Sequence, residues 1–541
     1  MAEQDNRNRS DRPSANDLSR ELDTPWDVEA FLQKKTPAAT PPGGGEPQRG
    51  TSERREPQRR PSERREPERV YRMPEEPRPQ KKAPPRKKTR VNVRGWAILI
   101  GICLAALLVL VGLIFLIVSL VSTDTVEEDQ TLYTSPTVES VSREEILNDI
   151  LTRADRLAMS YDYDGAVAVL AQYGSDWLEQ PELSQAKTRY QTAQSTLEKV
   201  ADTRDVTFLS FRSLIADTKR AFDGDEDAES YNQYHVTISE FNAILESLYA
   251  GGYVLVKPHD LFTTKVDDSG KQTYEQGEIY LPAGKKLLVI VQDDVNYYAS
   301  MIDGDGDGLA DAGGDGFAYR LAMDADGNLT CDYIGDDGKE SQGDYDLVPV
   351  LESFVEEHPD FSYRGAKGVV TVTGSEGVFG YHTHPDWKAK LGESSYAREV
   401  EMAQNVAACL KSNGWEIACH TYAHMSYGDS DAAAISADVS KWETEVQTVV
   451  GDTDLLFYPI KGGLYEYSGS GYEAMQEAGY RFYCTTGTEA NNLRLLDGYI
   501  RISRRLVGGY WLVNEPETLK DLFDAKKLVD EVRPTPVLPI S

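Results

Sequence analysis

A run of 26 residues without a single charge, Trp96–Val121, is the feature that most limits how this chain can fold. A helix of about 20 apolar residues crosses the hydrocarbon core of a bilayer, so this run is long enough to span one with some tilt. Core helices of soluble domains rarely run so long without a polar face. A cleavable signal peptide would begin near the N-terminus and have a shorter apolar run. The sequence therefore predicts one transmembrane helix at residues 95–122.

The charges on either side of this run differ in sign. Residues 1–94 carry 23 Lys and Arg against 16 Asp and Glu, whereas the rest of the chain carries 34 against 73. Basic residues tend to stay on the cytoplasmic side of a membrane, which predicts a single-pass protein of the cell membrane with a cytoplasmic N-terminus and an extracellular C-terminal part. The net charge of −32 argues against a nucleic-acid partner, because a polyanion would be repelled over most of the chain.

The segment before the span is poor in apolar residues and contains a ten-residue repeat, Glu46–Arg55 followed by Glu56–Arg65. Such a stretch cannot bury enough apolar surface to offset chain entropy, so residues 1–94 are predicted to be a disordered cytoplasmic arm. A solvated spacer is favoured over a binding segment, and the sequence does not identify a partner for the arm. Residues 123–142, rich in acidic and hydroxyl side chains, are predicted to form a stalk.

Residues 143–204 show the three- and four-residue apolar spacing of helices, and Ser142 with Glu145 forms a capping-box pattern at their start. One stretch of this segment resembles half of a tetratricopeptide repeat, but too few copies are present for a solenoid. The segment is predicted to be a short helical hairpin that spaces the anchor from the following domain, with peptide binding as the alternative.

From residue 205 to residue 520, short apolar strands alternate with amphipathic helices. This pattern is typical of a parallel sheet covered on both faces, and the number of units favours a closed or nearly closed β/α barrel in the α/β class. Residues 521–541 are expected to be a C-terminal tail. The strands are expected at Val206–Phe211, Tyr253–Pro258, Lys286–Gln292, Gly368–Gly374, Trp415–His420, Asp454–Pro459 and Arg481–Gly487.

Two of these strands end in residues that can bind a metal. Asp293 and Asp294 follow one apolar strand directly, and two adjacent carboxylates would repel each other unless a cation lay nearby. His420 and His424 follow another strand, and imidazoles four residues apart lie on one face of a helical turn, where both can bind one ion. An accidental pair of surface histidines is the alternative. In a β/α barrel, chemistry is expected at these strand ends.

These two motifs, DDVNYY and HTYAH, resemble the polysaccharide deacetylases of carbohydrate esterase family 4, in particular membrane-anchored bacterial members. The resemblance covers about residues 205–515 and implies a distorted, incomplete β/α barrel. It further implies that Asp293 is the general base, and that Asp294, His420 and His424 bind a divalent metal, Zn²⁺ being the most common.

The sequence departs from the family pattern at three places, the first being Gln292 before the paired aspartates, where the family usually has an aromatic residue. Tyr458 stands before Pro459, where the family has an arginine that orients the base, and no histidine follows His424 to protonate the leaving amine. His382 or His384 could supply that acid from another loop, although an exposed pair of loop histidines is the alternative.

A separate acidic segment, Asp303–Gly316, matches the first half of a calcium-binding loop. Asp303, Asp305 and Asp307 have the alternate spacing of calcium ligands, but the twelfth position holds glycine instead of glutamate. Asp311 or Asp315 could compensate. Weak Ca²⁺ binding and a flexible acidic turn remain as alternatives.

These features together predict a membrane-anchored, metal-dependent hydrolase that removes acetyl groups from an extracellular N-acetylated cell-wall polysaccharide. The first alternative is a catalytically impaired, deacetylase-like module that binds glycan. The second is a transmembrane signalling or assembly protein, for which the cytoplasmic repeats are the only support.

Overall fold

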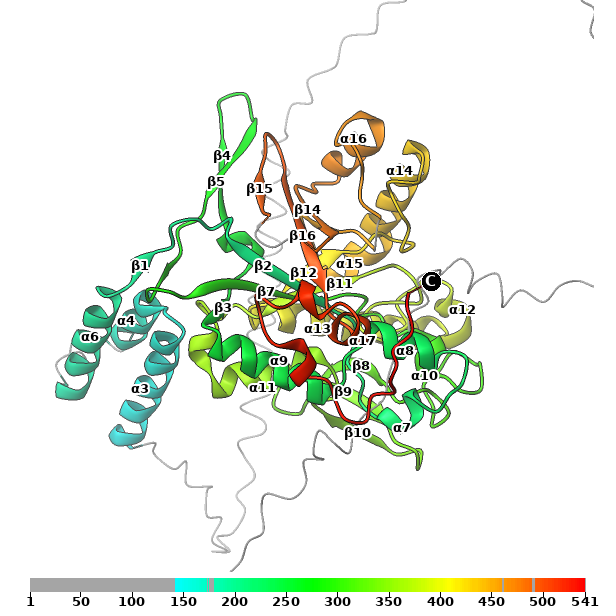
Figure 1. Ribbon diagram of the computed structural model, residues 1–541. Coiled ribbons are helices and arrows are strands. Elements are labelled where there is room, and N and C mark those ends of the chain that lie inside the picture. Colours follow the sequence, from blue (N-terminus) through cyan, green and yellow to red (C-terminus); the bar gives the residue numbers. More distant parts are fainter. Residues whose placement is uncertain (1–141, 173, 175–179, 460–461, 489–491, 541) are drawn as a thin grey trace, which may run out of the picture. The chain divides into compact units, whose positions relative to one another are not determined.

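A computed structural model describes residues 142–172, 174, 180–459, 462–488 and 492–540 of the 541-residue chain (Figure 1). The predicted cytoplasmic arm, transmembrane helix at 95–122 and stalk lie outside these ranges, apart from Ser142. Within the described ranges, no helix is both long enough and apolar enough to cross a membrane.

Seven parallel strands form a closed barrel. Each pairs with the next in the order β7-β11-β12-β13-β14-β16-β2, and β2 returns to β7, which closes the ring. The β/α barrel predicted from the alternation of strands and helices is therefore confirmed. The strands are β2 (Val206–Phe211), β7 (Lys286–Gln292), β11 (Gly368–Val372), β12 (Glu416–Cys419), β13 (Leu455–Phe457), β14 (Phe482–Thr486) and β16 (Ile500–Leu506).

One predicted strand has a different place, and one barrel strand was not predicted. The segment expected at Tyr253–Pro258 forms the short β3 (Tyr253–Leu255), which pairs only with the first half of β7. The second half of the same β7 edge pairs with β11. The unpredicted strand is β16, which lies between β14 and β2 and completes the ring.

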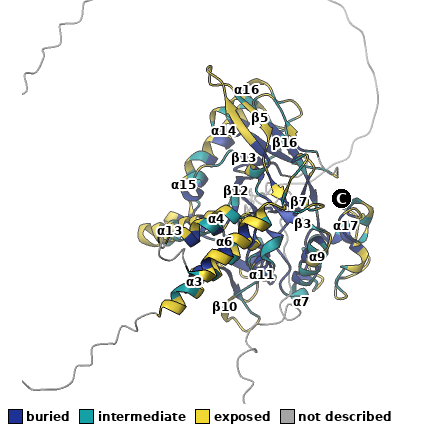
Figure 2. Cartoon of the chain, turned by 90° about the vertical axis from the view of Figure 1, so that its left-hand side faces the viewer, coloured by how far each residue is buried: buried dark blue, intermediate teal, exposed yellow. Residues whose placement is uncertain are grey.

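The barrel strands are buried on both faces, as parallel strands between helices must be. Alternate residues point into the barrel and out towards the helices, so Val289 and Val291 belong to the inner apolar cluster whereas Leu288 and Ile290 belong to the outer one. Figure 2 shows this burial along the strands and exposed residues on the outer sides of the helices. The covering helices are α9 (Ile238–Ala250), α11 (Leu347–Glu357), α13 (Glu393–Ser412), α14 (Ala432–Lys441) and α16 (Gly469–Glu477).

The segment predicted to be a helical hairpin contains three described helices, α3 (Arg143–Met159), α4 (Tyr163–Ala171) and α6 (Pro181–Gln194), with a small apolar core of their own. The predicted capping box of Ser142 and Glu145 is present at the start of α3. The segment contacts the barrel domain, because the Arg364 amide donates a hydrogen bond to the Ser160 carbonyl at 2.7 Å.

An antiparallel insertion follows β7. Its strands, β8 (Ala318–Met323), β9 (Leu329–Ile334) and β10 (Glu340–Gly343), form a separate sheet. A hairpin of β4 (Phe262–Val266) and β5 (Gln272–Gln276) precedes β7. The remaining elements are β1 (Glu198–Lys199), β6 (Tyr280–Leu281), β15 (Arg494–Leu495), α7 (Thr218–Ala221), α8 (Ala228–Tyr234), α10 (Ala299–Ile302), α12 (Trp387–Leu391), α15 (Gln447–Val450) and α17 (Gly509–Val513), together with a π-helical turn at Trp442–Val446 and 3₁₀ turns at Pro258–Asp260, Pro359–Phe361, Pro516–Thr518 and Ala525–Lys527.

The segment expected to be a C-terminal tail packs against α8 and α9. The guanidinium of Arg533 forms an ion pair with Glu240 on α9, and both side chains have an exposed fraction of 0%. Arg533 also donates hydrogen bonds to the backbone carbonyls of Asn232 and His235. The ordered domain therefore extends past residue 520, because a buried carboxylate on α9 requires the cation that this segment provides.

Candidate metal centre and catalytic site

The alternation of residues along the barrel strands places polar groups at the top of its interior. Val289 and Val291 on β7 point inward, and the next inward position is Asp293. On β16 the inward residues Ile500 and Ile502 are followed by Arg504. The carboxyl ends of parallel strands meet at one end of a barrel, so side chains far apart in the sequence gather there.

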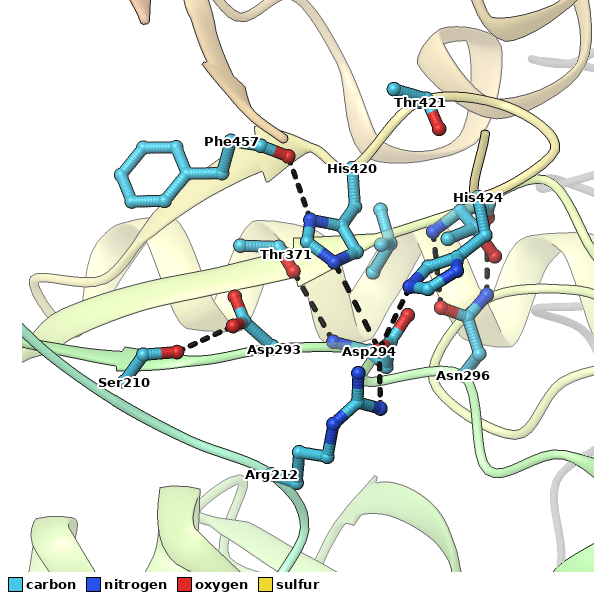
Figure 3. Close-up of polar contacts among 12 residues, drawn as sticks. Ser210, Arg212, Asp293, Asp294, Asn296, Thr371, His420, Thr421, His424 and Phe457 are labelled. Carbon is cyan, nitrogen blue, oxygen red and sulfur yellow. Dashed lines mark hydrogen bonds and ion pairs between the residues drawn. The ribbon is translucent and has the colours of Figure 1, made fainter. Parts of the chain in front are cut away.

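The structure brings together the three residues predicted to bind a metal. One ligand atom from each of Asp294, His420 and His424 lies within 4.8 Å of the others, and all three side chains are buried. The Nε2 atoms of His420 and His424 lie 3.9 Å and 3.4 Å from Asp294 Oδ2. Figure 3 shows both imidazoles facing this carboxylate.

The backbone around these ligands is not helical, so the expectation that His420 and His424 lie on one helical turn is wrong. Thr421 and His424 have φ values of 62° and 53°, in the left-handed region, and Asp294 has 59°. Asp438 on α14 holds the histidine loop, because its carboxylate accepts hydrogen bonds from the amides of Tyr422 and Ala423 at 2.7 and 2.8 Å. These bonds offset the cost of the left-handed conformation.

The ring of His420 is oriented by the backbone of β13. Its Nδ1 lies 2.7 Å from the carbonyl oxygen of Phe457, which can only accept a hydrogen bond, so Nδ1 carries the proton. Burial lowers the pKa of His420 to about 4, which keeps the ring neutral. The lone pair of Nε2 then faces the Asp294 carboxylate, an arrangement that a cation between them stabilises. Two imidazoles and one carboxylate are the donor set of a catalytic zinc site, so these residues fit the implied metal.

Asp293 has its own set of partners. Ser210 donates a hydrogen bond to Oδ2, and Arg504 reaches the same oxygen with Nε and Nη2, each at 3.0 Å. Burial raises the pKa of Asp293, but Arg504, His420 and the Ser210 hydrogen bond together lower it below its usual value, so the group is ionised. Among the described residues, buried Oδ1 has no hydrogen-bond partner. Asp293 therefore offers one unoccupied anionic oxygen that can accept a proton.

Arg504 is one of two arginines in this site that the sequence did not reveal. The resemblance implies an arginine before Pro459, but Tyr458 occupies that position, and its carbonyl accepts a hydrogen bond from Arg504 Nη2 at 2.9 Å. The cation beside Asp293 comes instead from β16. The available signal was the pattern Ile500-Arg501-Ile502-Ser503-Arg504, whose alternation indicates a strand with its last residue on the apolar side.

A second missed residue, Arg212, follows β2. Its Nη1 lies 2.7 Å from Asp294 Oδ2, and the exposed side-chain fractions are 6% for Arg212 and 2% for Asp294. Burial raises the pKa of Asp294, but His424, Arg212 and His420 together hold the pKa well below its usual range. Each of the two adjacent carboxylates therefore has its own arginine.

The two histidines considered as the acid contact other groups. His382 Nδ1 lies 3.4 Å from Glu399 Oε2, and its ring packs on Trp387 with 4.0 Å between ring centroids. His384 lies beside Asp386, whose amide donates a hydrogen bond to its Nδ1 at 3.3 Å. The catalytic role of these histidines stays a prediction.

The acidic segment after α10 gathers three carboxylates. One oxygen from each of Asp303, Asp305 and Asp311 lies within 4.8 Å of the others. Asp307 is not part of this group and accepts a hydrogen bond from the amide of Leu309. The third carboxylate of this group is therefore Asp311, one of the two residues that could compensate for the missing glutamate. Ca²⁺ binding at this group stays a prediction.

Comparisons with known proteins give one match in sequence and one in structure. Among curated proteins, none matches this chain. A solved structure, the Streptococcus pyogenes deacetylase PplD in complex with acetate, aligns over 58% of this chain and 94% of its own with 13% identity and a TM-score of 0.30, too low to carry an argument about this chain.

The sequence match covers two barrel strands, β12 and β13, and the start of a third, β14. The segment begins at the start of α13 and ends within β14, so it includes His420 and His424 but neither of the paired aspartates. Residues 393–483 match the model of the polysaccharide deacetylase family.

Proposed function

We propose that this protein is a metal-dependent deacetylase that hydrolyses acetamide groups on an extracellular, N-acetylated cell-wall polysaccharide. The observation that carries the proposal is the convergence of Asp294, His420 and His424 beside an ionised Asp293 at the carboxyl end of a β/α barrel. The family match over residues 393–483 supports the same activity. The apolar run at Trp96–Val121 and the charges beside it support attachment to the membrane with the barrel outside.

The proposed roles follow from the contacts of each side chain. Asp294, His420 and His424 would hold a divalent metal, most commonly Zn²⁺ in sites of this composition, which when bound polarises the acetyl carbonyl and lowers the pKa of water. Asp293 would accept a proton at Oδ1 from the water that attacks the acetyl carbon. Arg504 and Ser210 keep Asp293 ionised and fix its orientation by binding Oδ2. The bond between the acetyl carbon and nitrogen would break as the nitrogen takes a proton from the proposed acid, His382 or His384, and acetate and a free amine are released.

A second candidate, a glycan-binding module without catalysis, is favoured by the surroundings of the proposed acid. His382 packs against Trp387 and lies beside Glu399, and the cluster of Asp294, His420 and His424 does not include it. A protein that lacks a proton donor for the amine would bind the polymer and release little acetate.

Acetate release from an N-acetylated glucosamine oligomer tests the proposal. The full chain, purified in detergent and loaded with Zn²⁺ or Co²⁺, is expected to release acetate, whereas Asp293→Asn should lose at least a hundredfold in rate while still binding the metal. Asp521→Asn, outside the site, serves as the matched control. Retained glycan binding with no acetate release under any metal would select the binding module instead.

A further inference from the structure

The paired aspartates are electrostatically balanced by the protein itself. Asp293 faces Arg504 at 3.0 Å and Asp294 faces Arg212 at 2.7 Å, and all four side chains are at most 6% exposed. Two buried carboxylates and two buried guanidiniums carry no net charge. A buried carboxylate needs such a partner, so this arrangement makes the metal-free site a stable state of the fold.

Arg212 uses the same oxygen that the metal ligands share. Its guanidinium donates to Asp294 Oδ2, the atom that also lies 3.4 Å and 3.9 Å from the Nε2 atoms of His424 and His420. Figure 3 shows the guanidinium and the two imidazoles meeting at this one carboxylate. A divalent cation held by these ligands would share the carboxylate of Asp294 with a fixed positive charge.

We infer that Arg212 is a built-in counter-cation that weakens metal binding at Asp294 and stabilises the metal-free state. The inference rests on the proposed metal centre and adds that Arg212 limits how fully this centre is occupied by metal. A guanidinium carries a full positive charge that repels a divalent ion, and little solvent screens this charge in a buried site. The protein would then acquire and release its metal reversibly rather than hold it permanently.

The opposite role for Arg212 makes the opposite prediction. A side chain that only orients a ligand strengthens metal binding, and its loss typically lowers the affinity about 10- to 100-fold. A carboxylate ligand is oriented by hydrogen-bond donors, and a neutral donor would be enough for that role. Arg212 adds a full positive charge at 2.7 Å from the ligand oxygen, which favours repulsion as the larger effect.

The test is the dissociation constant of Zn²⁺ for the full chain in detergent, measured by competition with a chromophoric chelator. Arg212→Met is expected to bind Zn²⁺ at least tenfold more tightly than the unmodified protein. Arg212→Gln, which keeps a hydrogen-bond donor without the charge, should show the same direction. Arg320→Met is the matched control, because Arg320 pairs with Asp332 at 2.8 Å on the inserted sheet and should leave the constant unchanged.

Thermal unfolding with and without Zn²⁺ gives a second readout that does not need the variant to be highly stable. Loss of Arg212 removes the guanidinium that pairs with Asp294 in the metal-free protein, so the Zn²⁺-induced rise in Tm should be larger in Arg212→Met than in the unmodified protein. If the unmodified protein binds Zn²⁺ saturably and both Arg212 variants bind it equally well or more weakly, the role inferred for Arg212 is wrong, but the proposed metal centre stands. Absence of saturable binding in every variant overturns the proposed metal centre together with the inference.

Discussion

Arg504→Met is expected to lower the free energy of unfolding by about 3–5 kcal/mol, because it leaves Asp293 buried and charged without a cation. Nη2 of Arg504 lies 3.0 Å from Asp293 Oδ2, and the exposed side-chain fractions are 0% and 4%. At an effective dielectric constant of about 20, the Coulomb attraction over this distance is about 5 kcal/mol. The variant also loses the hydrogen bond from Arg504 to the Tyr458 carbonyl.

The same substitution should change the titration of Asp293. Burial raises the pKa of this carboxyl and Arg504 is the first of the groups that lower it, so the pKa must rise when the guanidinium is removed. If Asp293 is the base, the acid limb of the pH–rate profile for acetate release should move to higher pH.

Urea unfolding followed by circular dichroism measures the stability change, and Arg505→Met is the matched control. Arg505 pairs with Asp521 at 2.7 Å, but Asp521 is 48% exposed and can be hydrated when its partner is lost. The control leaves no buried charge behind and should therefore cost less than Arg504→Met. A loss for Arg504→Met no larger than that of the control, with an unmoved acid limb, would refute the reasoning.

Two further predictions concern stability away from the site. His259 lies between Glu416 and Asp454, at 2.9 and 3.0 Å, and although burial lowers its pKa, hydrogen bonds to the two carboxylates raise it to about 10. The interaction stabilises the fold fully below about pH 6.5, and this contribution disappears as the pH rises through about 10. The difference in urea midpoint between the unmodified protein and His259→Gln should therefore shrink between these two pH values. A difference that stays the same over this range would contradict the assignment. Arg533→Met should cost about 3–5 kcal/mol in thermal or urea unfolding, because Glu240 is left buried and unpaired, and a cost near zero would mean that residues 521–540 do not pack as described.

The barrel was predictable because most of its strands are continuous apolar runs. The segment 286–292 is apolar from its second to its sixth residue, and it forms β7 with the predicted bounds. The strand β16 was not predicted because three of its seven residues are arginines, a composition more typical of a surface segment. Arg504 is accommodated inside the barrel because it pairs with the buried carboxylate of Asp293, a contact that the sequence does not reveal.

The site was predictable in its residue types but not in its backbone. Asp293 and Asp294 at one strand end and His420 and His424 at another suggested one metal, and the structure brings the three expected ligands together. The helical turn inferred from the i, i+4 spacing failed because contacts to Asp438 on α14 hold the loop in a left-handed conformation. Such tertiary contacts override local spacing.

A crystal structure of the protein grown with Zn²⁺, with anomalous diffraction recorded at the zinc edge, tests the central claim most directly. The account predicts one strong anomalous peak about 2.0–2.2 Å from nitrogen atoms of His420 and His424 and from an oxygen of Asp294. A structure that holds Zn²⁺ only at Asp303, Asp305 and Asp311, or at no site while Arg212 remains on Asp294 at saturating Zn²⁺, would contradict it.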